Sequence, residues 1–224
     1  MDRILHPEGL EPVTRRLRES TDTTIVALGD SNTCNATFTG GAKQWPELLH
    51  AELRIHFATQ RVLLVNAGIC GDTARGGLAR LKTDVLRFSP HLTIVSFGSN
   101  DAKKVSREEF GEQINEMVDR LHKGGSAVLL RTAPPVMELE PPPPHIWRVD
   151  DAHRELMEVN RQVAVERRLP FVDNFGMWYD LEDQGKLNIA SLMHDCVHTN
   201  ARGHALIARQ IAPAFGMPPS LHWE

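Results

Sequence analysis

The chain has 224 residues, of which 41% are hydrophobic and 24% charged, as is usual for a water-soluble globular domain with one sizeable core. A formal net charge of -4, with no basic stripe, gives no electrostatic reason to expect nucleic acid or an anionic membrane as partner. No segment approaches the ~18 continuous apolar residues of a membrane span. The charged N-terminus lacks the apolar core of a secretory signal, and the three cysteines show no C-x-x-C spacing, so we expect a cytoplasmic protein.

Short apolar runs alternate along the chain with segments whose apolar residues recur about every 3.6 positions. Residues 1–23 are expected to form an N-terminal helix or arm packed on the domain that follows, residues 24–224. The predicted strands are 24–28, 62–65, 92–97, 126–132 and 171–173, and the predicted helices are 45–53, 74–88, 106–123, 151–168 and 200–212. Apolar strands separated by helices predict an α/β fold, in which a five-stranded parallel sheet lies between two helical layers.

The first predicted strand runs directly into Gly29-Asp30-Ser31-Asn32. A serine on the sharp turn from strand to helix exposes its oxygen at the carboxyl edge of a parallel sheet, beside the first helical N–H groups. Ser31 is therefore a candidate nucleophile. Taken alone, the same motif is also typical of a simple turn and helix cap, because Asp and Ser both cap helices.

Two further loops follow predicted strands and contain donors suited to a developing negative charge. The first is Asn66-Ala67-Gly68-Ile69-Cys70-Gly71-Asp72-Thr73, and the second is Gly98-Ser99-Asn100-Asp101. Glycine lets a backbone N–H approach an oxyanion closely, and an asparagine amide offers a second donor. Since an open parallel sheet has its ligand crevice at the carboxyl ends of the strands, we expect these loops to meet Ser31 there.

A candidate base lies near the C-terminus in Asp195-Cys196-Val197-His198. A serine hydroxyl becomes a good nucleophile when an imidazole takes its proton, and a carboxylate fixes the tautomer of that imidazole. Ser31, His198 and Asp195 are candidates for nucleophile, base and orienting carboxylate.

The four segments 29–32, 66–73, 98–101 and 195–198 are called blocks one to four below. With these blocks in this order, the chain resembles the SGNH hydrolases, also called GDSL-type esterases and lipases, over residues 24–204. The resemblance implies a flavodoxin-like sheet with strand order 2-1-3-4-5. It also implies that Ser31 attacks the acyl carbon, and that the oxyanion hole consists of the Ser31 N–H, the Gly71 N–H and the Asn100 side chain. Gly71 is preferred to Gly68 because it precedes Asp72-Thr73. Asn32 departs from the leucine or isoleucine that usually follows the family serine.

We therefore expect a serine esterase that forms an acyl-enzyme on a small ester, either a short acyl ester or an O-acetylated carbohydrate, with no cofactor and no metal. The Gly-Asp-Thr block and Trp45-Pro46 resemble the thioesterase and lysophospholipase branch, which stays open. A metal-dependent hydrolase would use His194, Asp195, His198 and His204, since His194 and His198 would share a helical face. A non-catalytic carbohydrate-binding domain is the remaining alternative.

Two features have no assigned role in this chemistry. Residues 133–150 contain four consecutive prolines, which favour a stiff extended segment that either lines the crevice or forms a surface connection. Cys34, Cys70 and Cys196 all fall inside the proposed active-site blocks, where we expect them to act as small packing residues.

Overall fold

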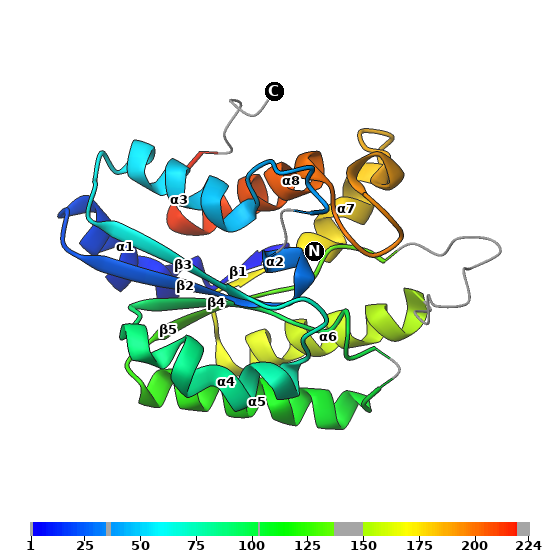
Figure 1. Cartoon of the computed structure of the whole chain (residues 1–224), viewed down its shortest axis with the longest axis horizontal. Coiled ribbons are helices and arrows are strands. Elements are labelled where there is room, and N and C mark those ends of the chain that lie inside the picture. Colours follow the sequence, from blue (N-terminus) through cyan, green and yellow to red (C-terminus); the bar gives the residue numbers. More distant parts are fainter. Residues whose placement is uncertain (1, 35–36, 103, 137–149, 219–224) are drawn as a thin grey trace.

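The computed structural model describes residues 2–34, 37–102, 104–136 and 150–218, and at its centre lies a six-stranded sheet of order β1-β6-β5-β4-β2-β3 (Figure 1). Five of these strands are parallel: β2 (Thr23–Gly29), β3 (Val62–Gly68), β4 (Leu92–Ser96), β5 (Ala127–Arg131) and β6 (Phe171–Val172). Their order, β3-β2-β4-β5-β6, is the 2-1-3-4-5 arrangement that the resemblance implies. The flavodoxin-like fold is thus confirmed.

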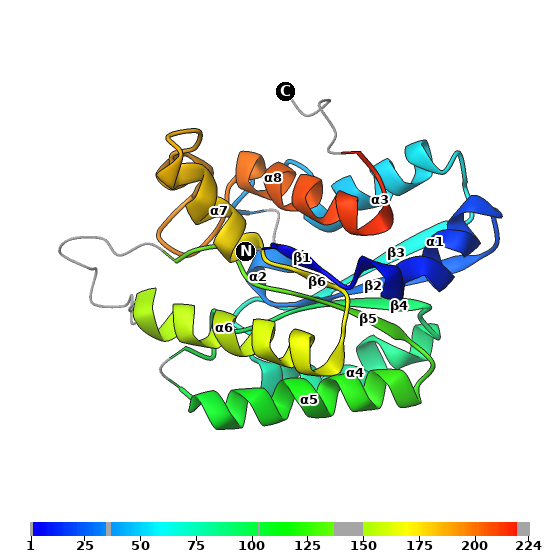
Figure 2. The same ribbon diagram turned by 180° about the vertical axis from the view of Figure 1, so that it is seen from behind.

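Helices cover both faces of this sheet (Figures 1 and 2). One layer contains α1 (Glu11–Arg18), α3 (Trp45–His56) and α8 (Ala201–Ile211), with α7 (Asn174–Asp183) at its end. The opposite layer contains α4 (Ala74–Asp84), α5 (Arg107–Lys123) and α6 (Asp150–Arg167). The remaining helical segments are the single turn α2 (Ser31–Cys34) and the 3-10 turns η1 (Pro7–Leu10), η2 (Leu86–Phe88), η3 (Ile189–Leu192) and η4 (Ala212–Phe215).

The core is split by the sheet, because successive side chains of a strand point to opposite faces. On β2, Ile25 and Ala27 pack with α3 and α8, whereas Val26 and Leu28 pack with α4, α5 and α6. All four side chains are fully buried. Full burial of a valine, leucine or isoleucine side chain stabilises the fold by roughly 1.5–3 kcal/mol. The continuous apolar strand β2 therefore fixes the centre of the sandwich.

The sixth strand differs from the prediction. Residues 4 and 5 form β1 (Ile4–Leu5), which lies at the edge of the sheet and pairs antiparallel with β6, with Ile4 opposite Val172. Two residues are too few to show any periodicity, so the sequence predicted only a helix or arm in this region. The helix is present as α1, six residues further along the chain.

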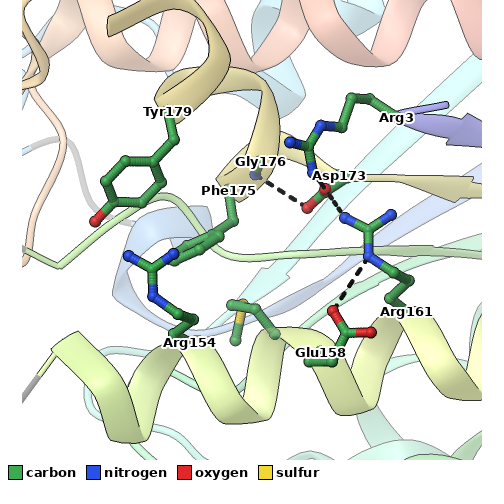
Figure 3. A pocket seen from close by; sticks show the side chains of 9 residues that line it. Arg3, Arg154, Glu158, Arg161, Asp173, Phe175, Gly176 and Tyr179 are labelled. Atoms are coloured by element: carbon green, nitrogen blue, oxygen red, sulfur yellow. Dashed lines mark hydrogen bonds and ion pairs between the residues drawn. The ribbon is translucent and has the colours of Figure 1, made fainter. Parts of the chain in front are cut away.

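An ion-pair cluster fixes β1 to the rest of the domain (Figure 3). The guanidinium of Arg3 donates to Asp173 at 2.6 Å and to Asp180 at 2.7 Å, while Arg161 from α6 also pairs with Asp173. This cluster lines a cavity of about 210 Å³ that includes none of the candidate catalytic residues. Because Arg3 and Arg161 are already paired with carboxylates, we interpret these ion pairs as structural contacts that hold β1, α6 and α7 together.

The proline-rich segment 133–150 is expected either to line the crevice or to form a surface connection. Most of it, residues 137–149 with the four prolines, lies outside the described residues. Within the described ranges, no helix has the length and apolar character needed to cross a bilayer.

Candidate active site

Residues 29–32, which include the candidate nucleophile Ser31 and are called the nucleophile turn below, join β2 to α2 at the carboxyl edge of the sheet. At this edge the chain order reverses between β3 on one side and β4 on the other. Gly29 has no room for a side chain, since a Cβ there would lie 2.8 Å from the Ser96 carbonyl oxygen of β4. The Asp30 carboxylate accepts the Asn32 N–H at 2.9 Å and so shapes the turn. Ser31, only 4% exposed, begins the helical turn as the sequence predicts.

The second block supplies the candidate glycine donor. Gly71 adopts φ +75, in the left-handed region where a residue with a Cβ is disfavoured, and nothing lies within 4 Å of a Cβ built there. Gly68, by contrast, ends β3 against α2, where a Cβ would lie 2.7 Å from that of Cys34. The two glycines therefore have different structural roles, and only Gly71 faces open space.

Asn100 lies between the first two blocks. Its side-chain nitrogen donates to the Asp72 carbonyl oxygen at 2.9 Å and makes a longer contact of 3.5 Å with the Asp30 carboxylate. The longer bond is the weaker one, so this N–H is the one more easily directed at a substrate oxygen. Ser31, Gly71 and Asn100 thus belong to three loops that are in contact at one edge of the sheet.

Next to Asn100, the Asp101 carboxylate closes the loop by accepting the N–H groups of Ala74 at 2.9 Å and Gly98 at 3.0 Å. Burial raises the pKa of Asp101 to about 6, despite these two bonds. It caps the first turn of α4 and fixes the turn that carries Asn100.

Asp195 and His198, the candidate orienting carboxylate and base, are joined by a hydrogen bond. The Asp195 carboxylate accepts a hydrogen bond from His198 Nδ1 at 2.8 Å and also accepts the backbone N–H groups of Val197 and His198. Burial raises the pKa of Asp195, but the bonds from His198 and Val197 outweigh it and hold the pKa below its usual value. The carboxylate is therefore ionised at neutral pH and fixes the tautomer of the imidazole.

Within the described ranges, no hydrogen bond joins the Ser31 hydroxyl directly to His198. Such bonds are often long or unformed before substrate binds. The two blocks are nevertheless in contact, because Asn32, adjacent to Ser31, bonds to Val197 and Thr199 on either side of His198.

Two residues at the site are not predicted by the sequence patterns. Phe38 stacks on the His198 ring, with 3.6 Å between ring centroids and 10° between the planes. Arg80 of α4 donates to Asp72 at 2.7 Å and to the carbonyl oxygens of Ala67 and Gly29 at 2.7 and 3.2 Å. A lone aromatic residue in a loop and one arginine on an amphipathic helix carry no motif that would single them out.

A layer of three buried side chains supports the nucleophile turn: Trp45, Arg131 and His204. The Trp45 indole N–H donates to the Asn32 carbonyl oxygen at 3.1 Å, and the Arg131 guanidinium lies over the Trp45 ring at 4.7 Å. The backbone N–H of Trp45 donates to His204 Nδ1, so this histidine is the neutral acceptor in the pair. Burial, helped by the charge of Arg131, lowers the pKa of His204 to about 3.

The three cysteines lie where the blocks meet. Cys34 and Cys70 have their sulfur atoms 3.5 Å apart, with Cys70 exposed and Cys34 half-buried, and Cys196 is buried at 2% exposure. Burial is the largest cause that raises the pKa of Cys34, to about 12.

The arrangement does not favour the metal alternative. His194 and His198 do not share a helical face, because they lie in an irregular loop closed by the Met193–Thr199 bridge. His204 points into the buried layer instead, where its Nδ1 accepts the Trp45 N–H. Among the described residues, no three histidine, cysteine or acidic side chains are grouped so as to hold a metal ion.

Comparison with known proteins places this geometry in context. The chain is 31% identical over 125 residues to an uncharacterized lipoprotein, YqeF, of Bacillus subtilis, and the match covers 51% of this chain and 49% of the lipoprotein. The chain therefore aligns with about half the length of that relative. It is also 29% identical over 148 residues to an arylesterase of Vibrio mimicus, covering 66% of this chain and 70% of the arylesterase.

Among solved structures, an acetylxylan esterase from Geobacillus stearothermophilus superposes with a TM-score of 0.74 over 90% of this chain and 97% of the esterase, at 20% identity. At that identity the likeness concerns the fold. The model of the GDSL-like Lipase/Acylhydrolase family matches residues 27–206, a range that includes all four blocks. The chain therefore belongs to the GDSL-like lipase/acylhydrolase family.

Proposed function

We propose that the protein is a serine esterase that hydrolyses small carboxylic esters through an acyl-enzyme. In this proposal Ser31 is the nucleophile, His198 the general base and acid, and Asp195 the orienting carboxylate. The Ser31 N–H, the Gly71 N–H and the Asn100 amide form the oxyanion hole. The observation that carries the proposal is the 2.8 Å bond between Asp195 and His198, in a loop held against the nucleophile turn through Asn32.

The reaction begins when His198 takes the proton of the Ser31 hydroxyl while the serine oxygen attacks the ester carbonyl carbon. The carbonyl oxygen then becomes negatively charged, and the three donors stabilise it in a site where that charge is poorly solvated. Collapse of this intermediate breaks the ester bond, and His198 returns the proton to the leaving alcohol. Water attacks the acyl-Ser31 in the same way, which releases the acid and restores the hydroxyl.

The surroundings of His198 stabilise its protonated form. The ionised Asp195 stabilises the imidazolium that forms during each step. The face of Phe38 adds a further favourable contact for a cation, since the π-system is negative at its centre. The ring is 23% exposed, so water can reach it for the second half-reaction.

For the substrate, we propose a short acyl ester or an O-acetylated carbohydrate. The names of the arylesterase and the acetylxylan esterase support this class. An acyl thioester or a lysophospholipid is the second candidate, supported by Trp45-Pro46 at the start of α3, where the indole supports the nucleophile turn. A panel of p-nitrophenyl esters of increasing chain length, with acetylated xylo-oligosaccharides and an acyl-CoA, separates the two.

The decisive test is Ser31→Ala, measured with a fluorophosphonate probe and the best ester of the panel. The variant should fold like the wild type and lose roughly 10⁴ to 10⁶ in kcat, as expected for a triad nucleophile. The probe should label Ser31 in the wild type and nothing in the variant. EDTA should have no effect on the activity. A fully active Ser31→Ala, or loss on chelation that zinc restores, would contradict the proposal.

A cytoplasmic location is the last part of the proposal. It is supported by Cys34, Cys70 and Cys196, none of which forms a disulfide within the described residues, as suits a reducing compartment. Cell fractionation should recover the protein with a cytosolic marker enzyme. Recovery with the membranes or in the medium would contradict it.

A further inference from the structure

Asn32 differs from the apolar residue that usually follows the family serine, and the structure gives it an unusual set of contacts. Its side chain is 2% exposed and bonds to both residues that flank His198. The amide nitrogen donates to the Val197 carbonyl oxygen at 3.2 Å, and the amide oxygen accepts the Thr199 N–H at 3.1 Å and the Thr199 hydroxyl at 3.3 Å. One side chain therefore holds the backbone on either side of the candidate base.

The chemistry of these partners requires an amide. The Val197 carbonyl can only accept a hydrogen bond, and the Thr199 N–H can only donate one. Leucine would fill the space but satisfy neither group. A carboxylate would accept from Thr199 and repel the Val197 carbonyl oxygen. A backbone group that loses its hydrogen-bond partner away from water is destabilising, so either replacement would loosen this contact.

The main chain of Asn32 is fixed as firmly as its side chain. Its N–H donates to the Asp30 carboxylate at 2.9 Å, and its carbonyl oxygen accepts the indole N–H of Trp45, which is fully buried. The amide thus projects from a rigid turn. Because Ser31 is the preceding residue of that turn, the position of the amide is tied to the position of the serine.

The other contacts of the His198 ring do not connect it to the nucleophile turn. Asp195 belongs to the same loop and moves with it, and Phe38 comes from the loop between α2 and α3. These two contacts orient the ring. The distance between the base and the serine depends instead on how the 194–200 loop is held against α2, which is where Asn32 acts.

We propose that Asn32 is a positioning residue that sets His198 at proton-transfer distance from Ser31. The inference rests on the proposed esterase function and adds to it a residue that touches neither substrate nor the reacting atoms. A displacement of about 1 Å between reacting groups can cost about 10²-fold in rate. Removal of the amide should therefore lower kcat by about 10- to 100-fold, with KM within about twofold of the wild type.

The experiment compares Asn32→Leu and the isosteric Asn32→Asp with the wild type, and uses Asn115→Leu as a control. Asn115 lies on α5, where its amide donates to the Gly111 carbonyl oxygen and accepts from Arg167, and neither partner belongs to the proposed site. For each protein one measures kcat and KM on p-nitrophenyl acetate, the melting temperature, and the rate of fluorophosphonate labelling of Ser31 from pH 5 to 9.

Both Asn32 variants should label Ser31 more slowly across this pH range and lose kcat, even at temperatures well below their melting points. Asn115→Leu should lower the melting temperature while kcat and labelling stay as in the wild type. A lower melting temperature with unchanged kcat and labelling in the Asn32 variants would reduce the residue to a structural role and overturn the inference. A wild type that neither reacts with the probe nor cleaves the ester would instead overturn the proposed function.

Discussion

Arg80 binds Asp72 through a 2.7 Å hydrogen bond while the same guanidinium donates to the Gly29 carbonyl oxygen at 3.2 Å. Asp72 follows Gly71, and Gly29 lies two residues before Ser31, so one side chain joins the loop of the candidate oxyanion donor to the nucleophile turn. Both partners of the ion pair are largely buried, at 13% and 11% side-chain exposure. Breaking such a pair leaves a poorly solvated charge.

Arg80→Ala should therefore lower both stability and activity. Loss of one partner of a buried ion pair costs about 3 kcal/mol or more, which urea unfolding would measure directly. Arg80→Lys should recover part of the stability but less of the kcat, because an ammonium cannot reach three acceptors in the fixed geometry of a guanidinium. The matched surface control is Arg75→Ala, whose pair with Glu109 is exposed and should matter little. Equal effects of Arg80→Ala and Arg75→Ala would contradict this role.

The oxyanion hole can be tested at two of its three members. Asn100→Ala removes a donor needed mainly when charge develops on the carbonyl oxygen, so kcat should fall about 10² to 10³ with KM little changed. Gly71→Val should be worse, because a β-branched residue is strained at φ +75 and its side chain would enter the open space beside the loop. If Asn100→Ala changed KM alone, the amide would bind the ground state and the assignment would be wrong.

Stability should depend on pH through His204. Its pKa is lowered to about 3 in the folded protein, whereas an unfolded histidine titrates near 6.5. Below about pH 6.5 the unfolded chain gains a proton that the folded protein does not, so the free energy of unfolding falls by up to about 1.4 kcal/mol per pH unit from this residue. Above about pH 6.5 its contribution is fully present.

His204→Asn keeps an acceptor for the Trp45 N–H and has no such proton to gain. Urea unfolding at pH 7.5, 6 and 5 should show a smaller loss of stability on acidification in this variant than in the wild type. His56→Asn, at an exposed position on α3, should leave the wild-type slope unchanged. The prediction fails if His204→Asn and the wild type lose stability in parallel.

A maleimide should modify Cys70 before the other two thiols, because Cys70 is exposed, Cys196 is buried and the pKa of Cys34 is raised to about 12. The adduct would lie next to Gly71 and should remove most of the esterase activity, and a bound substrate analogue should protect. Cys70→Ala should stay active and become insensitive, while Cys196→Ala should behave like the wild type. A well-folded but inactive Cys70→Ala would indicate that a thiol takes part in the reaction.

The sequence predicts the central part of the fold because that part is built from long periodic segments. The residues expected in the five parallel strands match β2 to β6 closely, and the helix predicted at 106–123 begins at Arg107 with Ser106 as its N-cap. The helix predicted at 74–88 ends earlier, at Asp84, because Val85 leaves the helical conformation with φ -124. Propensity alone does not indicate that backbone change.

The parts that the sequence does not predict depend on long-range contacts. β1 has two residues and exists through its pairing with β6 and the Arg3–Asp173 ion pair. α7 has only weak amphipathic periodicity, and its first turn is capped by Asp173, whose carboxylate accepts the Gly176 N–H. Such contacts join residues more than a hundred positions apart, or polar atoms that no periodicity reveals.

For the candidate site, short motifs predict which residue types meet, but not what holds them together. The Asp195–His198 bond follows from a spacing of three residues. The stacking of Phe38 and the contacts of Arg80 could not be predicted, because they join the blocks to segments that have no motif of their own.

The short strand β1 has a practical consequence for anyone who trims this protein. A chain starting after His6 would keep every proposed catalytic residue, yet it would expose the outer edge of β6 and leave Asp173 without the Arg3 guanidinium. An uncovered apolar edge strand is a template for pairing with another chain. The first six residues are therefore best kept when the protein is shortened.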